Sequence, residues 1–180
     1  PIRILLIDDD EDDFRIFRAL LQKVSETRYA LYWVGDPDEA LDHMVQNAFD
    51  VYLLDYRLGA RSGIDLLRQA NSNGCRGPVI LTTGYGDPEV DMEAMAAGAT
   101  DYLTKGEWTP AVLERCIRYA LEHVRSRQAL VETYEQMEMQ VAERTAELTA
   151  ANEALKSSVE EMKRFAYSVC HDLKGPAIGI

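Results

Sequence analysis

The chain has 180 residues and a formal net charge of −12, from 31 acidic and 19 basic residues. That length suits one globular domain plus an extended element. The negative charge argues against a protein that binds the phosphate backbone of nucleic acids.

Cysteine content and hydropathy further restrict the kind of protein that this sequence can be. Cys75, Cys116 and Cys170 are scattered without a C-x-x-C pair, which indicates reduced thiols rather than a metal site or a disulfide framework. No apolar run approaches the roughly 18 residues needed to cross a bilayer, and no signal peptide precedes Ile2. We therefore expect a cytoplasmic protein with no membrane segment in this chain. Its abrupt ends indicate a piece of a longer protein.

Five short apolar runs alternate with segments of helical periodicity in the first part of the chain. The runs are residues 2–7, 29–34, 51–54, 79–81 and 99–104. Asp36-Pro37 and Thr109-Pro110 each combine an N-cap residue with a proline in the first turn, as at helix starts. Strands that alternate with helices predict right-handed βαβ units. We therefore expect an α/β fold with a doubly wound, five-stranded parallel sheet.

Polar residues follow four of these runs. They are Asp8 and Asp9, Asp55, Thr83 and Lys105. In an open parallel sheet the carboxyl ends of the strands form the edge where ligands bind. Three carboxylates that converge there need a cation, and all-oxygen ligation favours Mg²⁺. With a lysine and a threonine opposite, such a site can accept a phosphoryl group through attack by a carboxylate.

Residues 1–125 resemble the receiver domain of two-component response regulators in four segments: ILLIDDD, VYLLDYRLG, PVILTTGYGD and GATDYLTK. The resemblance implies a flavodoxin-like sheet with strand order 2-1-3-4-5. It also implies that Asp55 is the phosphoacceptor. The donor would be an upstream histidine kinase or a phosphotransfer protein.

The same resemblance assigns roles to the residues at the strand ends. It gives the Mg²⁺ ligands as Asp8, Asp9, Asp55 and the backbone carbonyl of Arg57. Thr83 and Lys105 would contact the phosphoryl oxygens. Thr83 would also form a switch with Tyr102, whose ring turns inward when Thr83 moves.

The pocket departs from the family pattern at three positions. Gly106 follows Lys105 where the family usually has proline, so the local chain does not fix the pose of the lysine. Arg57 and Tyr85 are bulky at positions that flank the path of hydrolytic water in the family. We therefore expect a long-lived phosphoryl group.

The remaining acids of the first cluster have a simpler interpretation. Asp10, Asp12 and Asp13 are interpreted as the solvated start of a helix, because acidic residues are common there.

A heptad pattern runs through the last third of the chain, which has no proline between Pro110 and Pro176. Its d positions are Val141, Leu148, Leu155, Met162 and Val169, and its a positions are Thr145, Asn152, Val159 and Ala166. Such a pattern predicts a parallel coiled-coil homodimer, in which Asn152 fixes a two-stranded register. The helix would be about 90 Å long. The segment AERTAELTAANEALKS, residues 142–157, resembles the signalling helix that links input domains to histidine kinases, and we expect that helix to span residues 126–164.

The segment FAYSVCHDLKGP, residues 165–176, resembles the H-box that opens the dimerisation and phosphotransfer domain of histidine kinases. We therefore expect residues 165–180 to be the start of such a domain. By this resemblance His171 accepts a phosphoryl group from ATP, and Asp172 orients its imidazole. Gly175 stands where many relatives carry a residue used for phosphatase activity, so we do not expect that activity. The chain shows no Gly-rich nucleotide loop, so we expect no ATP-binding domain in it and no autophosphorylation by it alone.

Together these features predict a phosphorelay protein in which Asp55 is phosphorylated and controls, through a dimeric coiled coil, a kinase core that begins at His171. Because a continuous helix places the two phosphoacceptors far apart, we expect no direct transfer between them. One alternative is a receiver-headed dimeric adaptor with a vestigial H-box. A phosphatase with an aspartate nucleophile is another, although the D-x-D spacing is absent at Asp55. The pocket could also be inactive as a phosphoacceptor, in which case only dimerisation would contribute to function.

Overall fold

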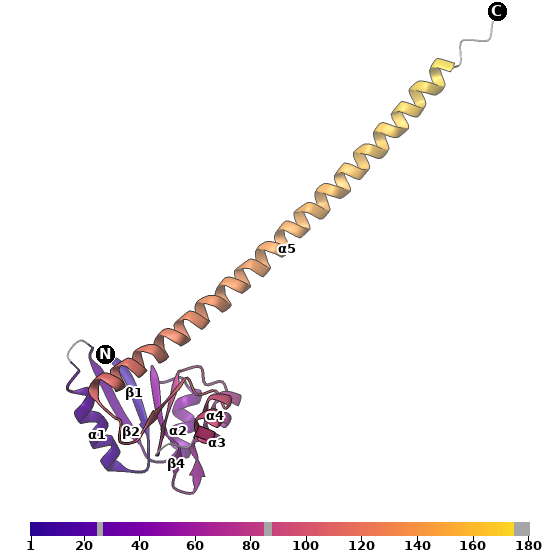
Figure 1. Ribbon diagram of the computed structural model, residues 1–180. Helices are drawn as coiled ribbons and strands as arrows, with labels where there is room; N and C mark the ends of the chain where they lie inside the picture. The colour runs from indigo at the N-terminus through magenta and orange to yellow at the C-terminus, as the bar shows by residue number, and fades with distance from the viewer. Residues whose placement is uncertain (25–26, 85–87, 175–180) are drawn as a thin grey trace, which may run out of the picture. The chain divides into compact units, whose positions relative to one another are not determined.

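The computed structural model describes residues 1–24, 27–84 and 88–174, and for 88–91 and 172–174 it describes the backbone only. The chain divides into two compact units, Pro1–Gln128 and Ala129–Ile180. Figure 1 shows the order of their elements. In the described part of the chain, no helix is both long and apolar enough to cross a membrane.

A five-stranded parallel sheet forms the centre of the first unit. Its strands are β1 (Ile2–Ile7), β2 (Tyr29–Val34), β3 (Val51–Asp55), β6 (Val79–Thr83) and β7 (Asp101–Thr104). Their order is β2-β1-β3-β6-β7, and every neighbouring pair is parallel. The predicted fold class and strand order are therefore confirmed. The sheet is buried on both faces, which explains why β3 and β6 are apolar along most of their length.

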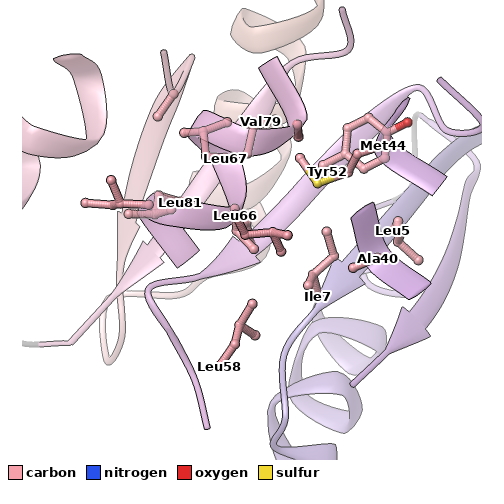
Figure 2. Packing of buried hydrophobic residues seen from close by; sticks show 14 of the residues in the cluster. Leu5, Ile7, Ala40, Met44, Tyr52, Leu58, Leu66, Leu67, Val79 and Leu81 are labelled. Carbon is pink, nitrogen blue, oxygen red and sulfur yellow. The ribbon is translucent and has the colours of Figure 1, made fainter. Parts of the chain in front are cut away.

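Helices cover both faces of this sheet. They are α1 (Glu11–Leu21), α2 (Pro37–Val45), α3 (Gly63–Ser72), α4 (Pro88–Ala96) and α5 (Pro110–Lys174). One core joins the sheet to α2, α3 and α4, and includes Met44, Tyr52 and Leu67, as Figure 2 shows. The other joins it to α1 and the first turns of α5, through residues such as Phe17 and Ile117.

Side-chain caps set the helix starts close to the strand ends. Asp10 accepts a hydrogen bond from Asp12 N at 2.9 Å and caps α1. Asp12 is exposed and pairs with Arg15 at 3.0 Å. The interpretation of Asp10 and Asp12 as a solvated helix start is therefore confirmed. The predicted caps at Asp36 and Thr109 are present too, and they accept from backbone N–H groups in the first turns of α2 and α5.

The segment after Asp55 is more ordered than the sequence predicts. It forms an antiparallel hairpin of β4 (Arg57–Leu58) and β5 (Arg61–Ser62), for which the sequence shows no strand pattern. Gly63 follows, with its N–H donating to Tyr56 O at 2.8 Å. A Cβ at Gly63 would collide with the backbone carbonyl of Asp55. The glycine therefore lets α3 begin directly against the end of β3.

The second unit consists of the remainder of α5, and its described side chains from Ala129 to His171 are all exposed. Three threonine hydroxyls, of Thr133, Thr145 and Thr149, donate to the carbonyl four residues earlier, at 2.7–2.8 Å. These polar groups are thereby satisfied within the helix.

Candidate functional site

Asp8 and Asp9 follow β1, and the structure buries one and exposes the other. Asp8 is 0% exposed, and its Oδ1 accepts a hydrogen bond from Asp10 N at 2.9 Å. The backbone carbonyl of Asp8 accepts another from Trp33 Nε1 at 2.8 Å. Asp9 is exposed, and its Oδ2 accepts from Gly59 N at 3.1 Å. Both carboxylates are thus held by backbone donors at the edge of the sheet.

Asp55 ends β3 and is nearly buried, with 5% of its surface exposed. Thr82 Oγ1 donates a hydrogen bond to Asp55 Oδ1 at 3.2 Å. Sequence reasoning misses Thr82, although it is the register partner of Asp55 in the neighbouring strand. Thr83 is buried one residue further along β6, and its carbonyl accepts from Lys105 N at 2.7 Å. The contact expected between Thr83 and a phosphoryl group stays a prediction.

Lys105 follows β7, and three carboxylates surround its ammonium group. Its Nζ donates to Asp13 Oδ2 at 2.7 Å, and lies 3.0 Å from Asp55 Oδ1 and 3.6 Å from Asp8 Oδ2. The interpretation of Asp13 as a solvated residue is therefore wrong, because its side chain is only 14% exposed. Gly106 has a φ of 97°, in the left-handed region that favours glycine. The pose of Lys105 is set by its charged neighbours.

The carboxylates fit a divalent cation. Asp8, Asp9 and Asp55 each offer a carboxylate oxygen, and these oxygens all lie within 4.8 Å of one another. Asp8 Oδ2 is buried and has no hydrogen-bond partner among the described residues. An unsatisfied buried carboxylate oxygen is costly, so this atom is a suitable ligand for a cation. The all-oxygen donor set favours Mg²⁺ among the common ions.

The pKa values of the pocket residues are consistent with a cation site. Burial raises the pKa of Asp8 to about 7, although the hydrogen bond from Asp10 N opposes the shift and the charge of Asp55 adds to it. Burial also raises the pKa of Asp55, against the lowering effect of Lys105. For Lys105, burial would lower the pKa, but hydrogen bonds to Asp13 and Asp55 outweigh it and raise the pKa. A bound cation would favour the ionised carboxylates.

Two further predicted residues lie near the pocket. Arg57 begins β4, two residues after Asp55, and its side chain is exposed. Its carbonyl as a metal ligand stays a prediction. Tyr102 lies in β7 opposite Leu81, with 39% of its surface exposed. It lines a hollow of about 260 Å³ beside Trp108. Its proposed switching role also stays a prediction, and Tyr85 lies outside the described residues.

The H-box residues lie in the second unit. His171 is an exposed residue of α5. The side chain of Asp172, Gly175 and Pro176 lie outside the described part of the chain. The predicted phosphoacceptor role of His171 is therefore not tested by this structure.

Comparisons with known proteins match the first unit. Residues 4–118 match the family described as the response regulator receiver domain. Response regulator RppA of Synechocystis sp. is 37% identical over 107 residues, which are 58% of this chain and 44% of that protein. The two-component response regulator PhoP of Pseudomonas aeruginosa is 32% identical over 95 residues, which are 53% of this chain and 42% of that protein.

Solved structures give the same result. A response regulator receiver domain protein from Clostridium thermocellum is 28% identical with a TM-score of 0.60, and the match covers 73% of this chain and 99% of that one. A CheY-like receiver domain protein from Methanospirillum hungatei is 25% identical with a TM-score of 0.60, covering 70% of this chain and 98% of that one. The chain spans less than half the length of the curated relatives it matches.

Proposed function

Because the chain belongs to the response regulator receiver domain family, we propose that Asp55 accepts a phosphoryl group from a separate histidine kinase or phosphotransfer protein. One observation carries this proposal. The carboxylate of Asp55 meets the ammonium of Lys105 at 3.0 Å, within a cluster of carboxylate oxygens that can hold a cation. Nucleophile, counter-charge and metal ligands thus converge at one edge of the sheet.

The chemistry follows from this arrangement. A carboxylate oxygen of Asp55 attacks the phosphorus of a phosphohistidine, the P–N bond breaks, and the released imidazole takes up a proton. Mg²⁺, held by Asp8, Asp9 and Asp55, would offset negative charge on the phosphoryl oxygens. Lys105 supplies a second positive charge, with its Nζ 3.0 Å from Asp55 Oδ1. Thr82 holds Asp55 Oδ1 and so orients the nucleophile.

A titration with beryllofluoride, which mimics an aspartyl phosphate, tests the pocket. With Mg²⁺ present, we expect beryllofluoride to shift backbone NMR signals of residues around Asp55 and Lys105 in the wild-type chain. Asp55→Asn should abolish the shifts, because the oxygen that binds beryllium is replaced by an amide. Shifts of equal size in both proteins would contradict the proposal.

We also propose that α5 pairs with a second copy of the chain. Apolar side chains at the d positions of the second unit are strongly exposed in one copy. They are Val141, Leu148, Leu155, Met162 and Val169, with 41–70% of their surface accessible. Helix propensity alone contributes little stability to an isolated helix, and most helices are stabilised by packing of their apolar face. The exposed apolar stripe therefore supports pairing in a parallel coiled coil. Thr145, at an a position, already satisfies its hydroxyl on Val141 O at 2.7 Å, which permits its burial in the seam.

Pairing of the helices would let the receiver domain act on the segment that follows them. We propose residues 1–125 as receiver, 126–164 as signalling helix and 165–180 as the start of a kinase phosphotransfer domain, with phosphorylation at Asp55 biasing the paired helices. In the full-length protein, Asp55→Asn should then change autophosphorylation at His171 when the upstream donor is present. An unchanged rate would favour the adaptor with a vestigial H-box.

A further inference from the structure

The closest neighbour of the Lys105 ammonium is a carboxylate that the proposed chemistry does not use. Asp13 Oδ2 lies 2.7 Å from Nζ, closer than Asp55 Oδ1 at 3.0 Å and Asp8 Oδ2 at 3.6 Å. Charge-assisted hydrogen bonds at this distance are strong when they are shielded from water. The side chains of Asp13 and Lys105 are 14% and 32% exposed, so this pair is largely shielded.

Asp13 is well placed to hold its partner still. It lies in the first turn of α1, which Asp10 caps and which Phe17 anchors in the core at 0% exposure. Lys105, in contrast, carries a long flexible side chain and is followed by Gly106, which has no side chain to pack against it. The rigid partner therefore determines where the mobile ammonium rests.

We propose that Asp13 is a positioning residue that keeps the Lys105 ammonium from forming a hydrogen bond to Asp8, so that a divalent cation and the lysine can occupy the pocket together. This inference rests on the proposed function, because it concerns the same phosphoryl-accepting site. Without Asp13, the described carboxylates that remain close to Nζ are Asp55 at 3.0 Å and Asp8 at 3.6 Å, and the buried Asp8 Oδ2 has no hydrogen-bond partner among the described residues. The ammonium would then compete with the cation for its ligands.

Competition predicts a specific pattern of Mg²⁺ affinities. Asp13→Asn should weaken Mg²⁺ binding about tenfold. This is the lower end of the loss in metal affinity seen when a residue that orients metal ligands, without contacting the metal itself, is mutated. It should also slow phosphorylation by a small phosphodonor at subsaturating Mg²⁺. Asp13→Glu keeps the carboxylate and should restore part of the affinity.

A double-mutant cycle separates this role from a general effect of negative charge. In a Lys105→Met background no ammonium can compete, so Asp13→Asn should change Mg²⁺ affinity far less than in the wild-type chain. Asp12→Asn is the matched control, since Asp12 is the neighbouring exposed acid that pairs with Arg15. It should leave Mg²⁺ affinity nearly unchanged.

An NMR measurement tests the contact itself without metal or phosphodonor. The chain has five lysines, so the ammonium signal of Lys105 in ¹⁵N-lysine-labelled protein can be assigned by its loss in Lys105→Met. We expect a slowly exchanging signal in the wild-type chain and in Asp12→Asn, and much faster exchange in Asp13→Asn.

Calorimetric Mg²⁺ titration of these variants, together with the ammonium signal, decides the proposal. A tenfold loss that disappears in the Lys105→Met background supports it. Equal effects of Asp13→Asn in both backgrounds, or equal effects of Asp13→Asn and Asp12→Asn, would overturn it. If the wild-type chain binds Mg²⁺ but takes up no phosphoryl group, the proposed function fails while the cycle still decides the role of Asp13.

Discussion

The beginning and the remainder of α5 share one heptad pattern, because Ile117 and Ala120 stand at a and d positions in register with Thr145 and Val141, but the two parts have different environments. Ile117 and Ala120 are 0% and 1% exposed because they pack against the sheet, whereas Val141 and Leu148 are 65% and 70% exposed. In the first unit the partner of the apolar stripe is the sheet of the same chain. In the second unit no described residue covers it. The difference shows that a heptad pattern identifies an apolar face but not what covers that face.

The largest effect should come from charge in the exposed stripe. Leu148→Lys places an ammonium at a d position in both copies, so we expect the dimer of the 180-residue chain to dissociate at micromolar concentration. Light scattering after size-exclusion chromatography measures this directly. The receiver should keep its thermal unfolding transition. A dimer of unchanged mass would show that the stripe is not the seam.

Shortening a side chain in the part of the stripe that packs against the sheet should instead lower the stability of the receiver domain. Ile117→Ala should lower the free energy of unfolding of the first unit by about 2–4 kcal/mol, because it leaves a cavity against α1 and the sheet. Urea unfolding followed by Trp108 fluorescence reports the change, since Trp108 packs in the same core. Leu148→Ala is the matched variant. It should weaken the dimer with little effect on this transition. An equal loss of unfolding free energy in both variants would show that the two regions do not differ in this way.

A smaller effect should come from pH, acting on the receiver through Asp8. Its pKa is about 7 when folded against an ordinary value near 3.8, so the folded state holds the proton more tightly. The stability that this group contributes is present below pH 4 and lost as pH rises through 7. In a metal chelator, the wild-type chain should lose about 1 kcal/mol between pH 6 and pH 8 relative to Asp8→Asn. Mg²⁺ should reverse the trend, because it binds the ionised form; a wild-type profile parallel to that of Asp8→Asn would exclude this role for Asp8.

The smallest expected effect lies at Thr145. Its hydroxyl bonds within its own helix, so Thr145→Val should tighten the dimer only a few-fold, by about 0.5–1 kcal/mol. Sedimentation equilibrium at several concentrations can resolve this change. The receiver transition should not move. Weaker dimerisation would show that the hydroxyl has a partner across the seam.

The sheet and most of its pocket could be predicted because their signals are local. Apolar runs that end at Asp8, Asp55 and Lys105 identify strands and their carboxyl ends. Strand order depended on the resemblance to receiver domains, since apolar runs do not reveal which strands are neighbours. The hairpin of β4 and β5 was missed because two-residue strands have no periodicity.

Two contacts of the pocket needed three-dimensional information. Thr82 reaches Asp55 because the two are register partners, which follows from strand alignment and not from either segment alone. Asp13 differs from its neighbour Asp12 only in the direction its side chain takes from the first turn of α1. An acidic run cannot reveal which of its members meets a lysine 92 residues away.

Phosphorylation of Asp55 can be measured directly on the wild-type chain. Incubation with phosphoramidate and Mg²⁺, followed by borohydride reduction and peptide mass spectrometry, converts an aspartyl phosphate to homoserine and locates it. We predict one modified site, Asp55, in the wild-type chain and none there in Asp55→Asn or without Mg²⁺. No modification of the wild-type chain, or modification at another aspartate, would show that Asp55 is not the phosphoacceptor.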